Sequence, residues 1–516
     1  QDSRHVVVLC KNQFYCFSGL HADGRVGITE EGLNDIIVAV QEDAAQTGLT
    51  DTAAQAVGAL TTQTRDEWAV ARRRLAAVDE SNKRYLQLVD TALFVLCLDH
   101  TSPSTAGEIA ASCLHGSYAL AGDVGTCTNR WYDKLQLIVF ENGAAGVNFE
   151  HTWVDGHTVL RFASDVFADV IYRFANHLTS TTGGARGRDR MGEVFPPDKK
   201  AFSLCEGRTP VKMEWRLPRD LRRDIYFAET RISDLVRQHD VQALEYHTFG
   251  KRFITSNKMS PDAFVQMAIV YGYYGLYGDV VAAYEPVLTK AFLKGRTEAL
   301  RTVTAEVKSF LEAFCNPDIP MKRKMLSLRS AIVSHGRLVK LAAKVSGRLR
   351  ILCNAIFCLY RSLCRDLLAL PSLRGTQMFP CTVSGGTPSV SAADGIPALF
   401  EDEAWQTLNH VILSTSNCGN PSLRLFGFGP VVRDGFGVGY IIKENELKLV
   451  VTSKNRQTDR FVGKIREFFD TVHDAYNPIQ VQKRVRVVTT EDGPDETGGS
   501  YSMWGSFINR GDQPLI

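Results

Sequence analysis

Residues 135–156 read LQLIVFENGAAGVNFEHTWVDG, and this stretch says most about the fold. Apolar runs on both sides of Asn142-Gly143 predict a β-hairpin with a tight turn. The second strand ends at His151, and Asp155 and Gly156 follow closely. Imidazole titrates near neutrality, so this pattern indicates a general base supported by a carboxylate. A buried core histidine beside a solvated aspartate fits the same pattern, and the pattern alone leaves both readings open.

Length and composition bound the class of protein. The chain has 516 residues, 44% apolar and 22% charged, which is ordinary globular composition and favours about two to three domains. Lys plus Arg is 59 and Asp plus Glu is 57, so the net charge is +2 and no broad field attracts nucleic acid. The 12 cysteines form no C-x-x-C pair, so we expect reduced intracellular thiols and no metal site. The apolar runs are too short for a membrane span.

Periodicity predicts an α/β chain with mixed sheets. Residues 179–200 are rich in Thr, Gly, Arg and Pro and indicate a linker, and residues 371–397 indicate a second loop. The patterns predict hairpins at 5–17, 135–149 and 437–452, a strand at 411–413, and helices at 33–46, 66–78, 84–97, 158–178, 219–245, 261–312 and 457–474.

Two later segments carry further candidate site residues. Ser414-Thr415-Ser416 follows an apolar strand, and small hydroxyls there stabilise a developing oxyanion or form an ordinary polar turn. The run 424–437, RLFGFGPVVRDGFG, repeats glycine in a strand-like setting, which allows a ligand to approach the backbone. Its Phe428 suits a quaternary ammonium group, and a β-bend with core aromatics is the alternative.

Taken together, these segments resemble the choline/carnitine acyltransferase family in order and spacing. The resemblance runs from about residue 5 to about 474 and rests on six specific motifs. These are NRWYDK at 129–134, H-x-x-x-D-G at 151–156, KMSPD at 258–262, YE at 284–285 with GRTE-x-x-R at 295–301, STS at 414–416, and FGFGPVV at 426–432.

The resemblance implies two chloramphenicol-acetyltransferase-like domains with mixed sheets flanked by helices. They would be residues 1–193, truncated at the start, and residues 194–516, with an active-site tunnel at their interface. Within it, His151 would be the general base, Asp155 would support it, and Ser416 would stabilise the oxyanion of the tetrahedral intermediate. The acyl group would pass directly between thiol and hydroxyl, without an acyl-enzyme or a metal.

The family also implies substrate contacts. Carnitine would be held by Tyr284, Thr297, Arg350, Ser414 and Phe428, and Thr297 favours carnitine because choline-specific relatives have an apolar residue there.

Coenzyme A would be contacted by Lys251, Lys258, Ser260 and Asp262, with the lysines near its phosphates and Asp262 near the pantetheine arm. Surface lysines and a core tyrosine at position 284 are the ordinary alternatives. No permanently bound cofactor is expected, and coenzyme A or acetyl-CoA would be a co-substrate.

The acyl-chain length is predicted from the size of the side chain at position 426, where the FGFGPVV motif begins. Phe426 should fill the channel that is open in long-chain members, so we expect a carnitine O-acetyltransferase, most similar to fungal ones. The segment around His151 looks more like palmitoyl-transferring members, which keeps a medium- or long-chain enzyme as the alternative. A degenerate, non-catalytic acyl-CoA-binding protein is the alternative of another class.

Three departures from the family stand out. Pro286 replaces a serine that bonds carnitine, and Arg350 has lost the neighbours of the family's carboxylate-binding arginine, in a region, 345–398, that diverges throughout. The family also has a substantial portion before His5, so we expect a fragment of a longer protein. We expect a monomer in the mitochondrial or peroxisomal matrix.

Overall fold

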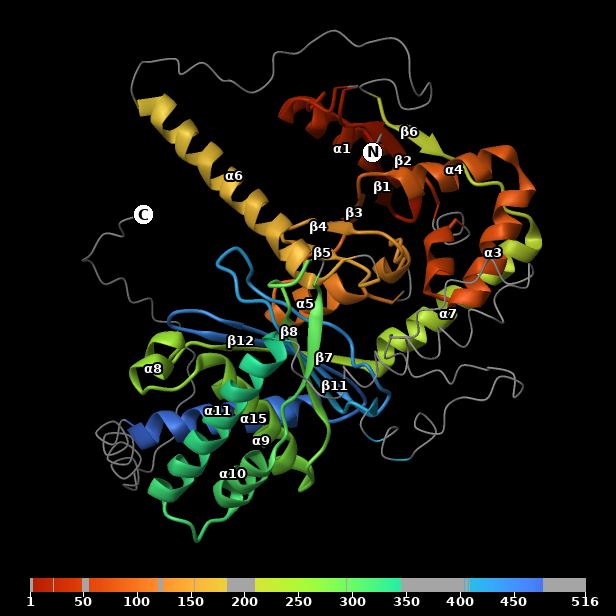
Figure 1. Ribbon diagram of the computed structural model, residues 1–516. Helices are drawn as coiled ribbons and strands as arrows, with labels where there is room; N and C mark the ends of the chain where they lie inside the picture. The colour runs from red at the N-terminus through yellow and green to blue at the C-terminus, as the bar shows by residue number, and fades with distance from the viewer. Residues whose placement is uncertain are drawn as a thin grey trace, which may run out of the picture. The chain divides into compact units, whose positions relative to one another are not determined.

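The computed structural model contains two six-stranded mixed sheets flanked by helices (Figure 1). This confirms the predicted α/β class with mixed sheets. Both sheets belong to one compact unit, Gln1–Phe468. The structure describes residues 3–182, 209–344 and 403–476, apart from gaps at 22, 49–54, 119–123, 153, 294, 404–406 and 408. The predicted linker beyond residue 182, the loop at 371–397, the divergent region 345–398 and Arg350 therefore lie outside the described residues.

The first sheet has the strand order β5-β4-β3-β1-β2-β6. The predicted hairpins at 5–17 and 135–149 are confirmed, because β1 pairs antiparallel with β2 and β4 pairs antiparallel with β5. Parallel pairing of β1 with β3 and of β3 with β4 joins the two hairpins. The strands are β1 (His5–Cys10), β2 (Gln13–Ser18), β3 (Val95–Asp99), β4 (Gln136–Phe140), β5 (Ala145–Asn148) and β6 (Val211–Met213).

Helices cover both faces of the first sheet. Helix α1 (Glu30–Ala45) packs on one face through Ile36, Val40 and Ala44. On the other face, Trp68, Trp131 and Trp215 join a core with residues of α3 (Arg65–Val78), α4 (Glu80–Thr91) and α7 (Arg219–Gln238). The remaining helices of this part are α5 (Ala106–Leu114), α6 (Gly156–Thr182) and the short η1 (Val57–Thr62) and η2 (Thr126–Thr128).

The NRWYDK motif at 129–134 connects the first sheet to the helices that cover it. Arg130 is fully buried, and its Nη1 and Nη2 donate to the two carboxylate oxygens of Asp99 at 2.8 and 2.7 Å. Asn129 donates to the Leu98 carbonyl, and Trp68 donates its ring N–H to Asp133 at 2.6 Å. The motif therefore joins the end of β3 to the core helices and leads directly into β4.

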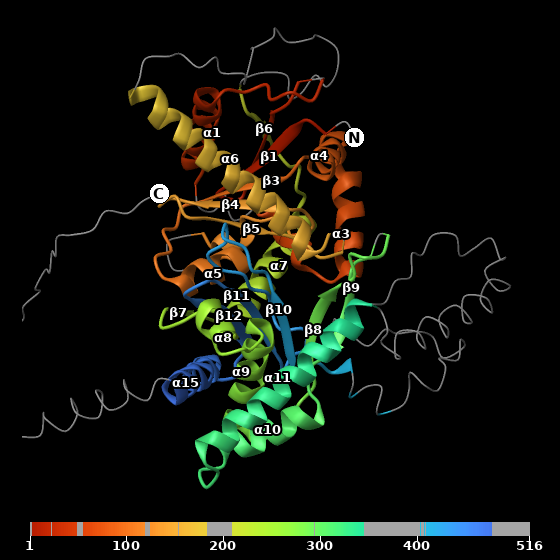
Figure 2. The same cartoon turned by 60° about the vertical axis from the view of Figure 1, so that its left-hand side comes forward.

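The second sheet has the order β7-β12-β11-β10-β8-β9. Helices α10 and α11 pack against each other, and both contact α9 (Figure 2). The predicted strand at 411–413 begins at Leu413, and the hairpin at 437–452 is confirmed. The elements are β7 (His239–Tyr246), α8 (Lys251–Ser256), α9 (Pro261–Tyr277), β8 (Ala283–Leu288), β9 (Thr297–Arg301), α10 (Ala305–Cys315), α11 (Met321–Ala343), β10 (Leu413–Asn417), β11 (Phe436–Ile442), β12 (Leu447–Lys454) and α15 (Thr458–Tyr476).

Three long helix predictions were wrong over part of their length. The helix predicted at 84–97 stops at Thr91 and is followed by β3, and the one at 219–245 gives way to β7 at His239. The stretch 261–312 holds β8 and β9 between two helices. In each case short apolar runs satisfy helical and strand periodicity alike, and pairing with distant strands decides between them.

The proposed division of the chain at residue 193 lies outside the described residues and stays a prediction. Strand β6 and helix α7, both C-terminal to residue 193, belong to the first sheet and its core.

Replacing Asp99 by Asn should destabilise the fold strongly. The change leaves the Arg130 charge buried without a counter-ion, which costs about 3–5 kcal/mol of unfolding free energy. Urea denaturation followed by circular dichroism measures the loss. The matched control is Asp165→Asn, which breaks a surface pair with Arg161 whose side chains are 61% and 77% exposed. That change should cost at most about 1 kcal/mol, and equal losses in the two variants would contradict the assignment.

Candidate active site

The His151 loop follows β5 and is held by an arginine from the second half of the chain. His151 is exposed, with its Nδ1 3.8 Å from Oδ1 of Asp155, which is mostly buried. Arg296 donates to the same Asp155 oxygen from Nη2 at 2.6 Å and from Nε at 3.0 Å, and it also donates to the His151 carbonyl. The hydrogen bond to Asp155 raises the pKa of Arg296. The predicted pair is thus close in space, and Arg296 clamps both residues.

Helix α6 begins directly after Asp155 and lies against the end of β10. A Cβ built on Gly156 would be 3.7 Å from the Sγ of Cys418, which lies two residues beyond Ser416. The sequence separates these residues by more than 260 positions, and the fold brings the His151 loop and the Ser416 end of β10 into the same neighbourhood.

Strand β10 divides its side chains between two faces, because successive residues alternate along a strand. Thr415 and Asn417 point to the α9 side, where Thr415 accepts from Gln266 at 2.8 Å and Asn417 donates to Asp262 at 2.9 Å. Ser414 and Ser416 therefore project from the opposite face of the sheet. Ser414 pairs with Tyr284 of β8, so three of the predicted site residues share this face.

The aromatic segment 426–429 covers the same face at β11. Ser414 and Ser416 pair with Gly437 and Gly439. A Cβ on Gly437 would meet the Phe428 carbonyl at 2.5 Å, and one on Gly439 would meet the Phe426 carbonyl at 2.3 Å. The repeated glycines were predicted to let a ligand approach the backbone. In the structure, Gly437 and Gly439 instead let the backbone of segment 426–429 pack closely on β11, which places Phe426 and Phe428 beside the two serines. Thr452 fixes the segment by donating to the Phe428 carbonyl at 2.6 Å.

Thr297 and Pro286 complete this face. Thr297 pairs with Leu288, and Pro286 lies beyond Tyr284, the last residue of β8 that pairs with β10. Proline cannot donate a ladder hydrogen bond, and this position tolerates it because pairing with β10 has ended. The departure from the family at Pro286 is therefore compatible with the strand.

The predicted coenzyme A residues gather where α8 meets α9. Lys251 begins α8 and forms an exposed ion pair with Glu444 at 3.1 Å. Lys258 stands in the turn with φ of 57°, and Ser260 caps α9 by accepting from the Ala263 N–H. Asp262, in the first turn of α9, accepts from the Tyr440 hydroxyl at 2.7 Å. Together with the Asn417 contact, this joins the cluster to the end of β10.

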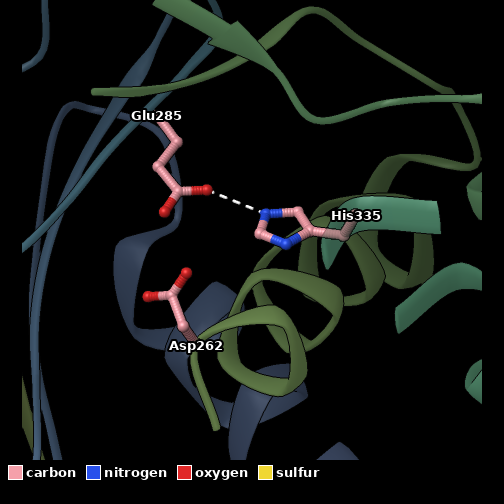
Figure 3. A group of neighbouring side chains, drawn as sticks. All are labelled: Asp262, Glu285 and His335. Carbon is pink, nitrogen blue, oxygen red and sulfur yellow. Dashed lines mark hydrogen bonds and ion pairs between the residues drawn. The ribbon is translucent and has the colours of Figure 1, made fainter. Parts of the chain in front are cut away.

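A buried cluster behind β8 was not predicted from the sequence. Glu285 of β8 forms a hydrogen bond of 2.8 Å with Nε2 of His335 of α11. Asp262 faces both residues from α9 (Figure 3). The donor atoms of these three residues lie within 4.8 Å of one another, a spacing that metal ligands share. Glu285 is nevertheless engaged by His335, and Asp262 by Tyr440 and Asn417, so hydrogen bonds account for the arrangement.

Burial controls the protonation of this cluster. Loss of solvent raises the pKa of Glu285 to about 7, the nearby Asp262 charge adds to the rise, and the His335 hydrogen bond opposes it. Burial also raises the pKa of Tyr440. With a pKa of about 7, Glu285 is protonated in part of the molecules at neutral pH, and in those it adds no second buried negative charge beside Asp262.

The signals that sequence reasoning missed are of two kinds. Arg296 is the basic residue of the GRTE motif and directly precedes β9. This basic residue in a motif is the sequence signal that could have suggested a partner for Asp155. His335, Gln266 and Tyr440 carry no local pattern, and the YE motif gives no sign of the partner of Glu285, because the partners of these residues lie 50 or more residues away.

Comparisons with known proteins identify the family of this chain. The profile of the family described as Choline/Carnitine o-acyltransferase matches residues 1–467. The chain belongs to this family.

Individual relatives are similar over most of the chain. A putative mitochondrial carnitine O-acetyltransferase of Saccharomyces cerevisiae is 38% identical over 481 residues, covering 89% of this chain and 65% of the relative. The mitochondrial carnitine O-palmitoyltransferase 2 of Mus musculus is 30% identical, covering 92% and 62%. The chain thus spans less than two thirds of these relatives. Among solved structures, the epimerization domain from the third module of tyrocidine synthetase B covers 73% of this chain and 79% of its own, with a TM-score of 0.27 and 8% identity.

A methyl group at Gly439 should displace the segment 426–429. The clash with the Phe426 carbonyl forces that backbone away from β11, so we expect Gly439→Ala to destabilise the protein by about 1–3 kcal/mol. Gly429→Ala is the matched control, since nothing lies within 4 Å of its added methyl. Thermal unfolding of both variants compares them, and an undisturbed Gly439→Ala would show that 426–429 does not rest on β11.

Glu285 should make stability depend on pH. Its folded pKa of about 7 exceeds its ordinary 4.5, so its contribution is complete below about pH 4.5 and is lost as the pH rises through 7. Relative to Glu285→Gln, the wild type should lose roughly 2–3 kcal/mol of unfolding free energy between pH 5 and pH 8.

Urea denaturation at a series of pH values measures this difference. Glu312→Gln, on the exposed surface of α10, should follow the wild type at every pH. A difference between wild type and Glu285→Gln that stays constant with pH would refute the raised pKa.

Proposed function

We propose that this protein is a carnitine O-acetyltransferase, which transfers an acetyl group reversibly between coenzyme A and the carnitine hydroxyl. The observation that carries the proposal is the shared face of β8 and β10, where Tyr284, Ser414 and Ser416 lie on the side away from α9, with the start of α6 against Cys418. The similarity to the yeast acetyltransferase supports the choice of acyl group.

The chemistry assigns one role to each group. His151 takes the proton of the carnitine hydroxyl, and the oxygen attacks the thioester carbonyl carbon. Ser416 donates to the oxyanion that forms on the former carbonyl oxygen. When the carbon–sulfur bond breaks, the thiolate takes the proton from His151, and the reverse reaction follows the same path. Asp155 and Arg296 keep the His151 loop in place through their ion pair.

The remaining residues would hold the two substrates. Tyr284, Thr297 and Ser414 would contact carnitine, with Phe428 facing its ammonium group. Lys251, Lys258, Ser260 and Asp262 would contact coenzyme A at the junction of α8 and α9. No further cofactor is proposed.

The acyl pocket and the location are proposed on similar grounds. Phe426 lies on the covered face of β11 and would limit the channel to short acyl chains. We propose a mitochondrial location, since the relatives are named mitochondrial, and a monomeric protein of two domains. No helix in the described part of the chain has the length and apolar character needed to cross a membrane.

The test is release of free thiol from acetyl-CoA, octanoyl-CoA and palmitoyl-CoA, each with carnitine, with choline and with no acceptor. We expect release that depends on carnitine and is fastest with acetyl-CoA. His151→Ala should lower kcat by about 10²- to 10⁴-fold because the proton acceptor is lost. His21→Ala, in the loop after β2, is the control and should leave kcat unchanged.

The other outcomes separate the alternatives. Fastest release with palmitoyl-CoA would replace the acetyltransferase by a long-chain enzyme. Acyl-CoA binding in calorimetry without release from any substrate would instead support a non-catalytic binding protein.

A further inference from the structure

The outward face of helix α11 combines positive charge with exposed apolar side chains. The opposite face of the helix packs on α9, α10, β8 and β9 through buried residues such as Leu328, Ile332 and His335 (Figure 2). Residues three, four and seven apart lie on one side of a helix. The outward face is formed by the exposed residues Lys322, Arg323, Leu326, Ser330, Val333, Arg337, Lys340 and Leu341, with Lys344 at the C-cap. The helix contains no Asp or Glu, so this face carries only positive charge.

The basic residues of α11 fall into two groups. Lys324 and Arg329 donate to backbone carbonyl groups of the protein itself. On the outward face, Arg337 interacts electrostatically with Glu306 of α10. The outward basic residues that form no ion pair within the described part of the chain are Lys322, Arg323, Lys340 and Lys344. Unpaired charges of one sign along a face attract an anionic partner.

Helices α7 and α15 show what an ordinary solvated helix looks like in this protein. Helix α7 has Asp220, Asp224 and Glu229 among its arginines, and α15 has Asp459 and Glu467 among its basic residues. Alternating signs of charge are typical of a helix exposed to water. The net charge of the whole chain is only +2, so the positive surplus on α11 is local.

Large apolar side chains lie between the charges of the outward face. Leu326, Val333 and Leu341 are 59%, 72% and 46% exposed. They follow one another at about every second helical turn, and the face from Lys322 to Leu341 is about 30 Å long. Basic residues that flank exposed apolar residues on one helix face are typical of a helix that lies in the plane of a membrane surface.

Charge complementarity favours a bilayer with anionic headgroups over other occupants of this face. A second copy of the chain would bring two positively charged faces together, which is unfavourable. A nucleic acid would offer phosphates to the basic residues, but its backbone offers no apolar surface to Leu326 and Val333. An anionic bilayer offers both, since its phosphates lie beside the boundary of the acyl chains.

We propose that the outward face of α11 binds the surface of a bilayer that contains anionic phospholipids. The basic residues contact the headgroup phosphates, and Leu326, Val333 and Leu341 enter the boundary between headgroups and acyl chains. The other face of α11 stays packed on the protein, so the helix lies on the bilayer surface. This inference goes beyond the proposed function and does not depend on it.

The experiment is flotation of the full chain with two kinds of vesicle, one of phosphatidylcholine alone and one of phosphatidylcholine mixed with phosphatidylglycerol. We expect binding to the mixed vesicles only, and the binding should weaken as salt is added. The double variant Lys322→Gln/Lys340→Gln should raise the apparent Kd by about 10- to 30-fold, because each basic residue near an anionic surface contributes about fivefold. The double variant Leu326→Gln/Val333→Gln should raise it by about tenfold or more, since two apolar side chains no longer enter the bilayer.

The matched control is Arg84→Gln/Arg219→Gln, which removes the same charge from exposed positions of α4 and α7. Its apparent Kd should stay within about twofold of wild type if α11 is the binding face. Thermal unfolding checks that every variant folds. Ser330→Glu, which adds a negative charge to the centre of the outward face, should also weaken binding and replaces the apolar variant if that one does not fold.

Four outcomes would overturn the proposal. The first is that wild type does not float with the mixed vesicles, and the second is that the control loses as much binding as Lys322→Gln/Lys340→Gln. The third is that Leu326→Gln/Val333→Gln binds the vesicles as wild type does while both proteins also bind a single-stranded RNA homopolymer, which would make the face a general polyanion site. The fourth is a dimer in analytical ultracentrifugation that Leu326→Gln/Val333→Gln dissociates, which would assign the face to a second copy of the chain.

Discussion

The fully buried pair of Arg130 and Asp99 is the constraint on which the first half of the molecule depends. Both side chains are excluded from solvent, so neither charge is tolerated without the other. The pair fixes the carboxyl end of β3 against the segment that leads into β4. Because β4 and β5 form one hairpin, the position of the His151 loop after β5 follows from a contact between two residues, Asp99 and Arg130, that both precede this hairpin.

In the second sheet, strand β10 carries polar side chains on both faces. Those on the face toward α9 need hydrogen-bond partners there. Alternation along β10 sends Thr415 and Asn417 into hydrogen bonds with α9, and this frees Ser414 and Ser416 to face the substrate side. The Asp262–Glu285–His335 cluster lies on the helix side of the same sheet. Protonation of Glu285 lets two carboxylates share that interior, and this support weakens as the pH rises through about 7.

Local sequence patterns predicted the parts of this structure that depend on neighbours in the chain. The Asn142-Gly143 turn and the hairpin at 437–452 follow from turn chemistry and alternation, and both are confirmed. Strands β7, β8 and β9 were predicted as helix because their apolar residues fit either period. Pairing with β12 makes β7 a strand and pairing with β10 makes β8 a strand, and both partners lie more than 120 residues further along the chain. Strand β9 then pairs with β8 at the edge of the sheet.

The candidate site shows the same distinction between residues that the sequence could identify and contacts that depend on the fold. Resemblance to the family selected His151, Asp155 and Ser416, which the fold brings to one neighbourhood. Arg296 lies in the GRTE motif, yet nothing in its spacing shows that it pairs with Asp155. That pairing depends on which groups face Arg296 across the fold. Arg350, for which the family suggested a role, lies outside the described residues.

The glycines of β11 also limit how this pocket can be redesigned. At Gly437 and Gly439 every other amino acid brings a Cβ into contact with the backbone of 426–429, so a library at these positions would yield mostly misfolded members. Phe426 and Phe428 contribute only their carbonyls to those close contacts, which leaves their rings open to substitution. Variation in pocket size is therefore expected to concentrate in the covering segment, while the strand beneath it stays invariant.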